Sequence, residues 1–153
     1  MRVLSHHRVK FVLIGALAAR LHGFPRLTAD AAITPADDKP NLERLAAALK
    51  DLDAKVYTES VPEGLAFDRS AAALSRAPMW NLVTSAGRLD LAFLPAGTKG
   101  YEDLAKGAER FEAFGVQFLA ASLDDIIRSK AATGRAKDDD DMVILRALKR
   151  SAK

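Results

Sequence analysis

The sequence predicts one domain of the α/β (α+β) class. Short apolar runs rich in β-branched and aromatic residues, such as residues 9–14 (VKFVLI), are typical of buried strands. Leucines and alanines recur at helical spacing over residues 41–51, as in an amphipathic helix that packs on a sheet. Two further apolar runs, residues 79–85 and 88–95, are separated by an Ala-Gly pair, which predicts an antiparallel hairpin. The chain has 153 residues, of which 49% are hydrophobic, and this is enough for one substantial core.

Glycine and proline mark the ends of the first predicted elements. The strand over residues 9–14 stops at Gly15, because glycine favours a turn over a continued strand. Residues 16–21 favour a short helix, which Gly23 and the following Pro25 end sharply. A strand, a tight turn and a short helix are therefore expected in succession.

A second strand is predicted over residues 29–34, ahead of the amphipathic helix. The polar turn PADDKPN lies between them, with Asn41 as a possible helix cap. Between residues 54 and 76 turn residues mix with an alanine run, and the segment VYTES favours a strand only weakly. No definite element is predicted in this segment.

The second half is predicted to close with helices. Ser122 and Asp125 resemble a helix-capping arrangement, and Gly134 separates that helix from the last one. The predicted elements after the hairpin are a short helix over residues 101–106, a strand region over 110–120 (RFEAFGVQFLA), a helix from 122 to about 132 and a last helix over 138–149.

Composition points to a cytoplasmic protein with no membrane segment. The chain has no cysteine, which excludes disulfides and thiolate metal sites and fits a reducing compartment. The apolar run over residues 11–17 is far shorter than a membrane span. The 23 Lys and Arg against 20 Asp and Glu give a net charge of +3, which allows a polyanionic partner without requiring one.

Two aspartates stand among apolar residues of predicted strands. Side chains alternate between the two faces of a strand, so Asp30, Ala32 and Thr34 share one face, and Arg88 shares a face with Asp90. A buried aspartate is costly unless it meets a cation or a hydrogen-bond donor, and a metal ion is one such cation. The alternatives are that Asp30 caps a turn after Thr28 and that Asp90 faces water.

The order of these features resembles a known family. The string GALAARLHGFPRLTAD is similar to the signature GGxAxxxxGxxRxTxDxD of the nucleotidyltransferase superfamily, in particular the AbiEii-like and MenT-like toxins of bacterial toxin–antitoxin pairs. The stretch SLDDIIRSKAATGRAKDDDDMVIL resembles the closing segment of that family. The resemblance implies a nucleotidyltransferase fold, a mixed β-sheet flanked by helices with further helices at the C-terminal end. It also implies transfer of a nucleotide from an NTP, with Mg²⁺, onto RNA, including a tRNA end, or onto protein.

The resemblance assigns phosphate-binding roles to several positions. The backbone amides of Gly15 and Ala16 would receive the triphosphate, helped by the N-terminus of the short helix. Lys130 and Lys137 match cationic positions of the family that could hold phosphate. Arg26 could contact phosphate as well, although an arginine in a turn after proline is as often solvated.

The resemblance also assigns the metal ligands. Asp30 falls on the first metal-binding carboxylate, Ala32 on the second, and Asp90 on the third, which acts as a base or helps to hold the metal. In the closing segment Asp138 matches an acid of the family's final cluster. The alternative is that Asp138 caps the last helix while Lys137 and Asp141 form an exposed pair.

Ala32 departs from the family pattern at a ligand position. Alanine offers no oxygen to Mg²⁺, which prefers octahedral oxygen coordination, so the chain as written is expected to be nearly inactive. A substitution that silences the enzyme, natural decay into a binding protein, or a different alignment would each explain Ala32. The agreement at Thr28, Asp30 and Asp90 favours a silenced or crippled enzyme.

Two rival functions remain open beside nucleotide transfer to RNA or protein. Ala32 itself supports a noncatalytic module that binds a nucleotide, RNA or a partner protein, as an antitoxin or regulator would. Transfer to a small molecule is the other rival, and the short chain leaves little room for the second domain that a drug pocket would need. The preferred base, a cognate antitoxin partner and the oligomeric state do not follow from the sequence.

Overall fold

A seven-stranded mixed β-sheet forms the centre of the computed structural model, which describes residues 1–25, 28, 30–135 and 139–151. The strand order is β3-β4-β5-β2-β1-β7-β6. The β2–β5 and β1–β7 pairs are parallel and the other pairs are antiparallel. The strands are β1 (Phe11–Ile14), β2 (Ala31–Pro35), β3 (Lys55–Val56), β4 (Met79–Thr84), β5 (Gly87–Ala92), β6 (Glu109–Ala113) and β7 (Val116–Ala120).

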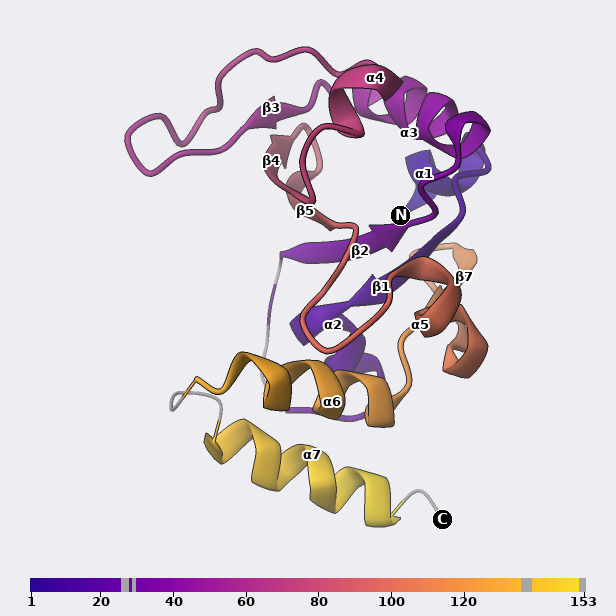
Figure 1. The fold of residues 1–153 in the computed structure, drawn as a ribbon, viewed down its shortest axis with the longest axis vertical. Coiled ribbons are helices and arrows are strands. Elements are labelled where there is room, and N and C mark those ends of the chain that lie inside the picture. Colours follow the sequence, from indigo (N-terminus) through magenta and orange to yellow (C-terminus); the bar gives the residue numbers. More distant parts are fainter. Residues whose placement is uncertain (26–27, 29, 136–138, 152–153) are drawn as a thin grey trace.

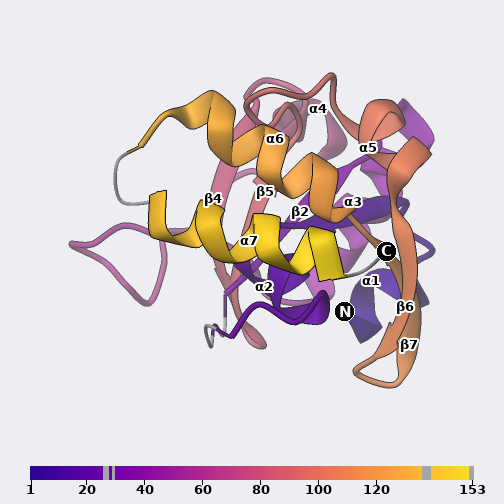
Figure 2. The ribbon, with the colours of Figure 1, turned by 90° about the horizontal axis from the view of Figure 1, so that it is seen from below.

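Helices lie on both sides of this sheet. Figure 1 shows α3 and α4 above the sheet and α2, α6 and α7 below it, and Figure 2 shows α6 and α7 side by side. The helices in the described residues are α1 (Arg2–His6), α2 (Gly15–Leu21), α3 (Lys39–Asp51), α4 (Ala71–Leu74), α5 (Tyr101–Gly107), α6 (Leu123–Thr133) and α7 (Asp139–Ser151). The predicted α/β class with a mixed sheet, flanking helices and C-terminal helices is confirmed.

One face of the sheet carries most of its buried leucines. Leu13, Ile33 and Leu91 are register partners on β1, β2 and β5, and all three are fully buried. On the same face Trp80 donates a hydrogen bond from its indole Nε1 to the carbonyl of Leu74 in α4, at 3.2 Å. This face therefore packs toward α3 and α4.

The opposite face carries the next row of side chains. Ile14, Ala32 and Asp90 are register partners on the same three strands, so they point away from α3 and α4. This is the side on which α2 begins at Gly15. The predicted alternation of faces on the second strand and in the hairpin thus holds, and it sets Asp90 on the side of α2 and α6.

The start of α3 differs from the prediction. Asp38 is the N-cap, and its carboxylate accepts a hydrogen bond from the backbone N–H of Asn41 at 3.1 Å. Asn41 lies inside the helix and is fully buried. Proline early in α3 fits this earlier start, because the first turn of a helix needs no N–H from that residue.

The strand region over residues 110–120 is a hairpin. Phe114 and Gly115 both have positive φ, at 56° and 77°, and they reverse the chain between β6 and β7. The short helix α1, before β1, was not predicted from the sequence. None of the helices in the described part of the chain has the length and apolar character that a membrane crossing requires.

Candidate nucleotide and metal site

The candidate site is built around the turn that joins β1 to α2. Gly15 follows β1 directly and has φ +72°, a conformation that residues with a side chain rarely adopt. A Cβ atom placed on Gly15 would lie 3.6 Å from Cβ of Ala32. Ala16 follows in the first turn of α2 and is exposed. The turn predicted to receive phosphate therefore lies directly beside the position of the absent carboxylate.

Asp30 and Asp90 both lie close to Ala32. Ala32 and Asp90 are register partners on the parallel strands β2 and β5. Asp30 immediately precedes β2, where its backbone N–H donates to the hydroxyl of Thr28 at 3.2 Å. The side chain of Thr28, and not that of Asp30, closes this turn. Residues 30, 32 and 90 thus lie together at one edge of the strand pair.

Burial and the charge of Arg88 have opposite effects on the pKa of the Asp90 carboxyl. Burial raises the pKa of the Asp90 carboxyl above its usual range, and the negative charge of Asp30 raises it further. The guanidinium of Arg88 opposes this rise, with Nη2 3.3 Å from Oδ1 of Asp90. Asp90 is therefore a carboxylate that holds its proton more tightly than a solvated one.

A cavity of about 150 Å³ opens on the other side of Gly15. It lies between the end of β1, the segment that follows β5, and α6. Its lining residues are Ile14, Gly15, Pro95, Thr98, Leu104, Ala121, Asp125, Ile126, Ser129, Lys130, Thr133 and Arg135. The structure thus brings Lys130 and Gly15, both predicted to hold phosphate, to one cavity.

Lys130 reaches this cavity from α6 while it contacts α7. Its Nζ lies 3.6 Å from Oδ2 of Asp141, whose side chain is only 5% exposed. Asp141 is therefore buried against α6, and the predicted exposed pair is wrong for this residue. No sequence pattern predicts the contact between Lys130 and Asp141, because it depends on how α7 packs on α6.

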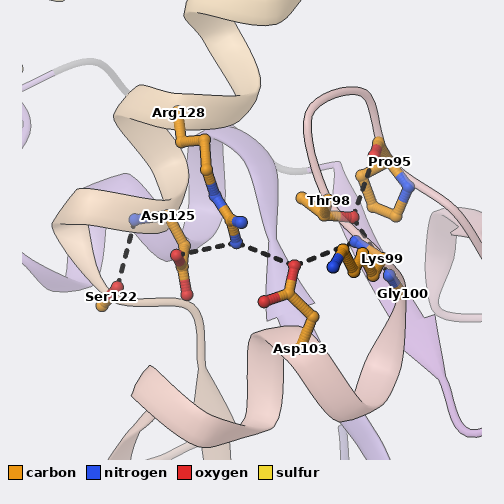
Figure 3. A network of polar contacts seen from close by, with 8 residues as sticks. All are labelled: Pro95, Thr98, Lys99, Gly100, Asp103, Ser122, Asp125 and Arg128. Carbon is orange, nitrogen blue, oxygen red and sulfur yellow. Dashed lines mark hydrogen bonds and ion pairs between the residues drawn. The ribbon is translucent and has the colours of Figure 1, made fainter.

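A polar network fixes the wall of the cavity (Figure 3). Arg128 of α6 bridges Asp125, at 2.9 Å, and Asp103 of α5, at 3.0 Å. Asp103 also accepts from the backbone N–H of Lys99 at 2.9 Å, and this hydrogen bond is the largest cause of its lowered pKa. The network joins α5 and α6 to the segment after β5. Hydrogen bonds and ion pairs between three parts of the chain therefore fix this wall of the cavity.

The tertiary structure was also compared with known proteins. A crystal structure from Thermotoga maritima, of a protein provisionally described as a nucleotidyltransferase, matches with a TM-score of 0.55 at 16% identity. The match covers 97% of this chain and 90% of that one. This chain has a nucleotidyltransferase fold. By sequence, no family model and no curated protein matches it.

Within this nucleotidyltransferase fold, the predicted site residues divide into three groups. Asp30 and Asp90 adjoin Ala32, and Lys130 shares a cavity with Gly15. Neither aspartate lines that cavity, so the two clusters meet only at Gly15 and its neighbour Ile14. Arg26, Lys137 and Asp138 lie outside the described residues.

The side chains at this site do not fit a site for two divalent cations. Within the described residues no group of three or more His, Cys, Asp and Glu side chains is placed to hold a metal ion. Ala32 has no oxygen to offer between Asp30 and Asp90, and the cationic Arg88 already pairs with Asp90. Mg²⁺ needs several oxygen ligands in near-octahedral geometry, so the remaining pair of carboxylates is a poor set for it.

Proposed function

We propose that this chain, over residues 1–153, is one nucleotidyltransferase-like domain of the toxin type whose activity Ala32 strongly reduces. The observation that carries the proposal is the row Ile14–Ala32–Asp90 beside the Gly15 turn. It puts the Gly15 turn, the half-buried carboxylate of Asp90 and the small side chain of Ala32 beside one another. The fold likeness supports the superfamily, and the sequence signature supports the toxin type.

In this proposal the substrate is an NTP bound across Gly15. The amides of Gly15 and Ala16 would bind its phosphates, and Lys130 would balance their charge from the cavity. Arg26 and Lys137 would add cationic contacts, and Asp138 would belong to the closing acid cluster. The acceptor would be RNA, including tRNA, or a protein, and a cognate antitoxin would be the partner in the cytoplasm.

Asp90 is the proposed base. A general base works best when its pKa is close to the working pH, and burial moves Asp90 in that direction. It would take the proton from the acceptor hydroxyl as that oxygen attacks the α-phosphate. With a carboxylate restored at position 32, Asp30 and Asp90 would complete the proposed Mg²⁺ ligands, and the ion would supply charge stabilisation to the leaving pyrophosphate. The absent oxygen at position 32 should lower the rate by roughly a hundredfold or more.

The test places a carboxylate at position 32, where the family pattern has a metal ligand. The chain and its Ala32→Asp variant are incubated with labelled NTPs, Mg²⁺ and total RNA or cell lysate. Label should pass to an acceptor with the variant, while a further Asp90→Asn change should abolish the transfer. If Ala32→Asp labels no RNA or protein with any of the four NTPs, the transferase proposal is wrong.

A noncatalytic nucleotide- or RNA-binding module is the second candidate. The Arg88–Asp90 pair favours it, because that pair balances the carboxylate without a metal ion. Calorimetry with ATP, GTP, CTP and UTP, with and without Mg²⁺, separates the two functions. Equal nucleotide affinity for the chain and Ala32→Asp, with turnover in neither, would favour the binding module.

A further inference from the structure

The guanidinium of Arg88 is fixed from three directions. Its Cζ lies 3.7 Å from the centroid of the Tyr57 ring, and Nε donates to the carbonyl of Leu82 at 3.2 Å. Nη2 donates to Oδ1 of Asp90 at 3.3 Å. A guanidinium that is stacked on an aromatic ring and bonded through Nε to a carbonyl loses little further freedom when it pairs with a carboxylate. This cation is therefore built into the sheet.

The place of this cation in the sheet is specific. Arg88 and Asp90 stand two residues apart on β5, so both side chains leave the same face of the strand. Only 26% of the Arg88 side chain and 32% of the Asp90 side chain is exposed, which limits screening by water. The lateral neighbour of Asp90 on β2 is Ala32, which brings no second negative charge.

We propose that Arg88 is the resident counter-cation of Asp90 and that it weakens the binding of divalent cations to this carboxylate. A divalent ion that approached Asp90 would have to break the Arg88–Asp90 pair or accept repulsion from a fixed positive charge nearby. The inference deepens the proposed function and rests on it, since it concerns the cofactor of the same site. Arg88 is a positioning residue here, because it acts through Asp90.

The test measures binding of Mn²⁺ alone by electron paramagnetic resonance, without nucleotide. Arg88→Met is introduced into the chain with Ala32 and into the Ala32→Asp variant, whose added carboxylate should bring binding into a measurable range. Removal of the guanidinium should raise Mn²⁺ affinity about tenfold in the Ala32→Asp background. Arg88→Lys keeps the charge but loses the stacking on Tyr57 and the Nε bond, so it should raise the affinity by less than Arg88→Met does. Arg110→Met, on the distant strand β6, is the matched control and should change nothing.

Each outcome decides a separate question. If Ala32→Asp binds Mn²⁺ more tightly than the chain with Ala32 and Arg88→Met adds no further increase, the inference about Arg88 is overturned while the proposed site stands. If neither change raises the affinity, the proposed metal site and the inference both fail. Should Arg88→Met not fold, Tyr57→Leu removes only the stacking ring and should raise the affinity about threefold. A folded Tyr57→Leu variant with unchanged Mn²⁺ affinity would also overturn the inference.

Discussion

Asp90 shows how burial sets the chemistry of a single residue. Its carboxyl is partly removed from water, and the resulting rise in pKa outweighs the opposing effect of Arg88. A raised pKa in the folded state means that folding favours the protonated form. The stability that Asp90 contributes is therefore fully present below the unfolded pKa, near 3.8, and is lost as pH rises through the folded pKa.

This linkage gives a pH-dependent prediction for Asp90→Asn. Asparagine stays neutral, so the variant should gain stability relative to the chain with Asp90 as pH rises from 3.5 to 7. Urea unfolding at several pH values measures the difference. Asp103→Asn is a control with the opposite sign, because the hydrogen bond from Lys99 lowers the pKa of Asp103. A stability difference for Asp90→Asn that does not change with pH would contradict the prediction.

Gly15 is needed for its backbone conformation more than for its size. A Cβ atom there would make only an ordinary contact with Ala32, at 3.6 Å, so the cost of a side chain comes from φ +72°. Gly15→Ala should lower the free energy of unfolding by about 1–2 kcal/mol. Gly15→Asn should cost less, because asparagine tolerates the left-handed region. Equal losses in urea unfolding for the two variants would point to crowding instead.

At the scale of elements, one buried amide ties α3 to the sheet. Oδ1 of Asn41 accepts from the backbone N–H of Lys10 at 2.7 Å, and Nδ2 donates to the carbonyls of Lys10, at 3.0 Å, and Ala36, at 2.7 Å. These bonds join the start of α3 to the residue before β1 and the residue after β2. The amide thus holds two adjacent strands and a helix in register.

Asn41→Ala should therefore destabilise the chain. It leaves the N–H of Lys10 and the buried carbonyl of Ala36 without their side-chain partner, and an unpaired buried group costs about 1–3 kcal/mol. The carbonyl of Lys10 keeps the hydrogen bond from the N–H of Ala36. The midpoint of urea unfolding measures the loss. Asn81→Ala on β4 is the matched control, because Asn81 is exposed, and it should shift the midpoint little. A loss for Asn41→Ala no larger than that for Asn81→Ala would show that the buried bonds contribute nothing net.

Elements with a strong local signal were predictable from the sequence. The Ser122 cap of α6 is one example, since its hydroxyl accepts from the N–H of Asp125 at 3.1 Å, as the Ser-x-x-Asp pattern predicts. The turn at Phe114, which joins β6 to β7, was not predicted, because a non-glycine residue with positive φ gives no signal in composition. The preference of asparagine for caps predicts that Asn41 caps α3, whereas its role in the structure depends on burial against distant strands.

The site is a product of the whole molecule. Alternation along single strands predicted that Arg88 and Asp90 share a face, and the structure places them in contact. Tyr57, which holds Arg88, lies in a segment with no clear pattern. The contact of Lys130 with Asp141 likewise depends on helix packing. The charged residues of the strands were therefore predictable from the sequence. The partners that long-range packing brings to them were not.

A substitution at position 32 tests the register between β2 and β5, which are parallel neighbours in the sheet. A carboxylate at residue 32 would stand directly beside Asp90, and like charges on register partners destabilise a sheet by roughly 0.2–1 kcal/mol. In a chelator, Ala32→Asp should unfold about 0.4–4 °C below the chain with Ala32, since 1 kcal/mol shifts the midpoint of a protein this size by about 2–4 °C.

A divalent cation should reverse this loss, because it would bind the folded form of Ala32→Asp between the paired carboxylates. Thermal unfolding in chelator and in Mn²⁺ measures the effect without any nucleotide or acceptor. Ala31→Asp is the matched control, since Ala31 points to the opposite face of β2, and Mn²⁺ should not restore its stability. If Mn²⁺ raises the midpoints of both variants equally, residues 32 and 90 do not share a cation, and the register between β2 and β5 has no part in metal binding.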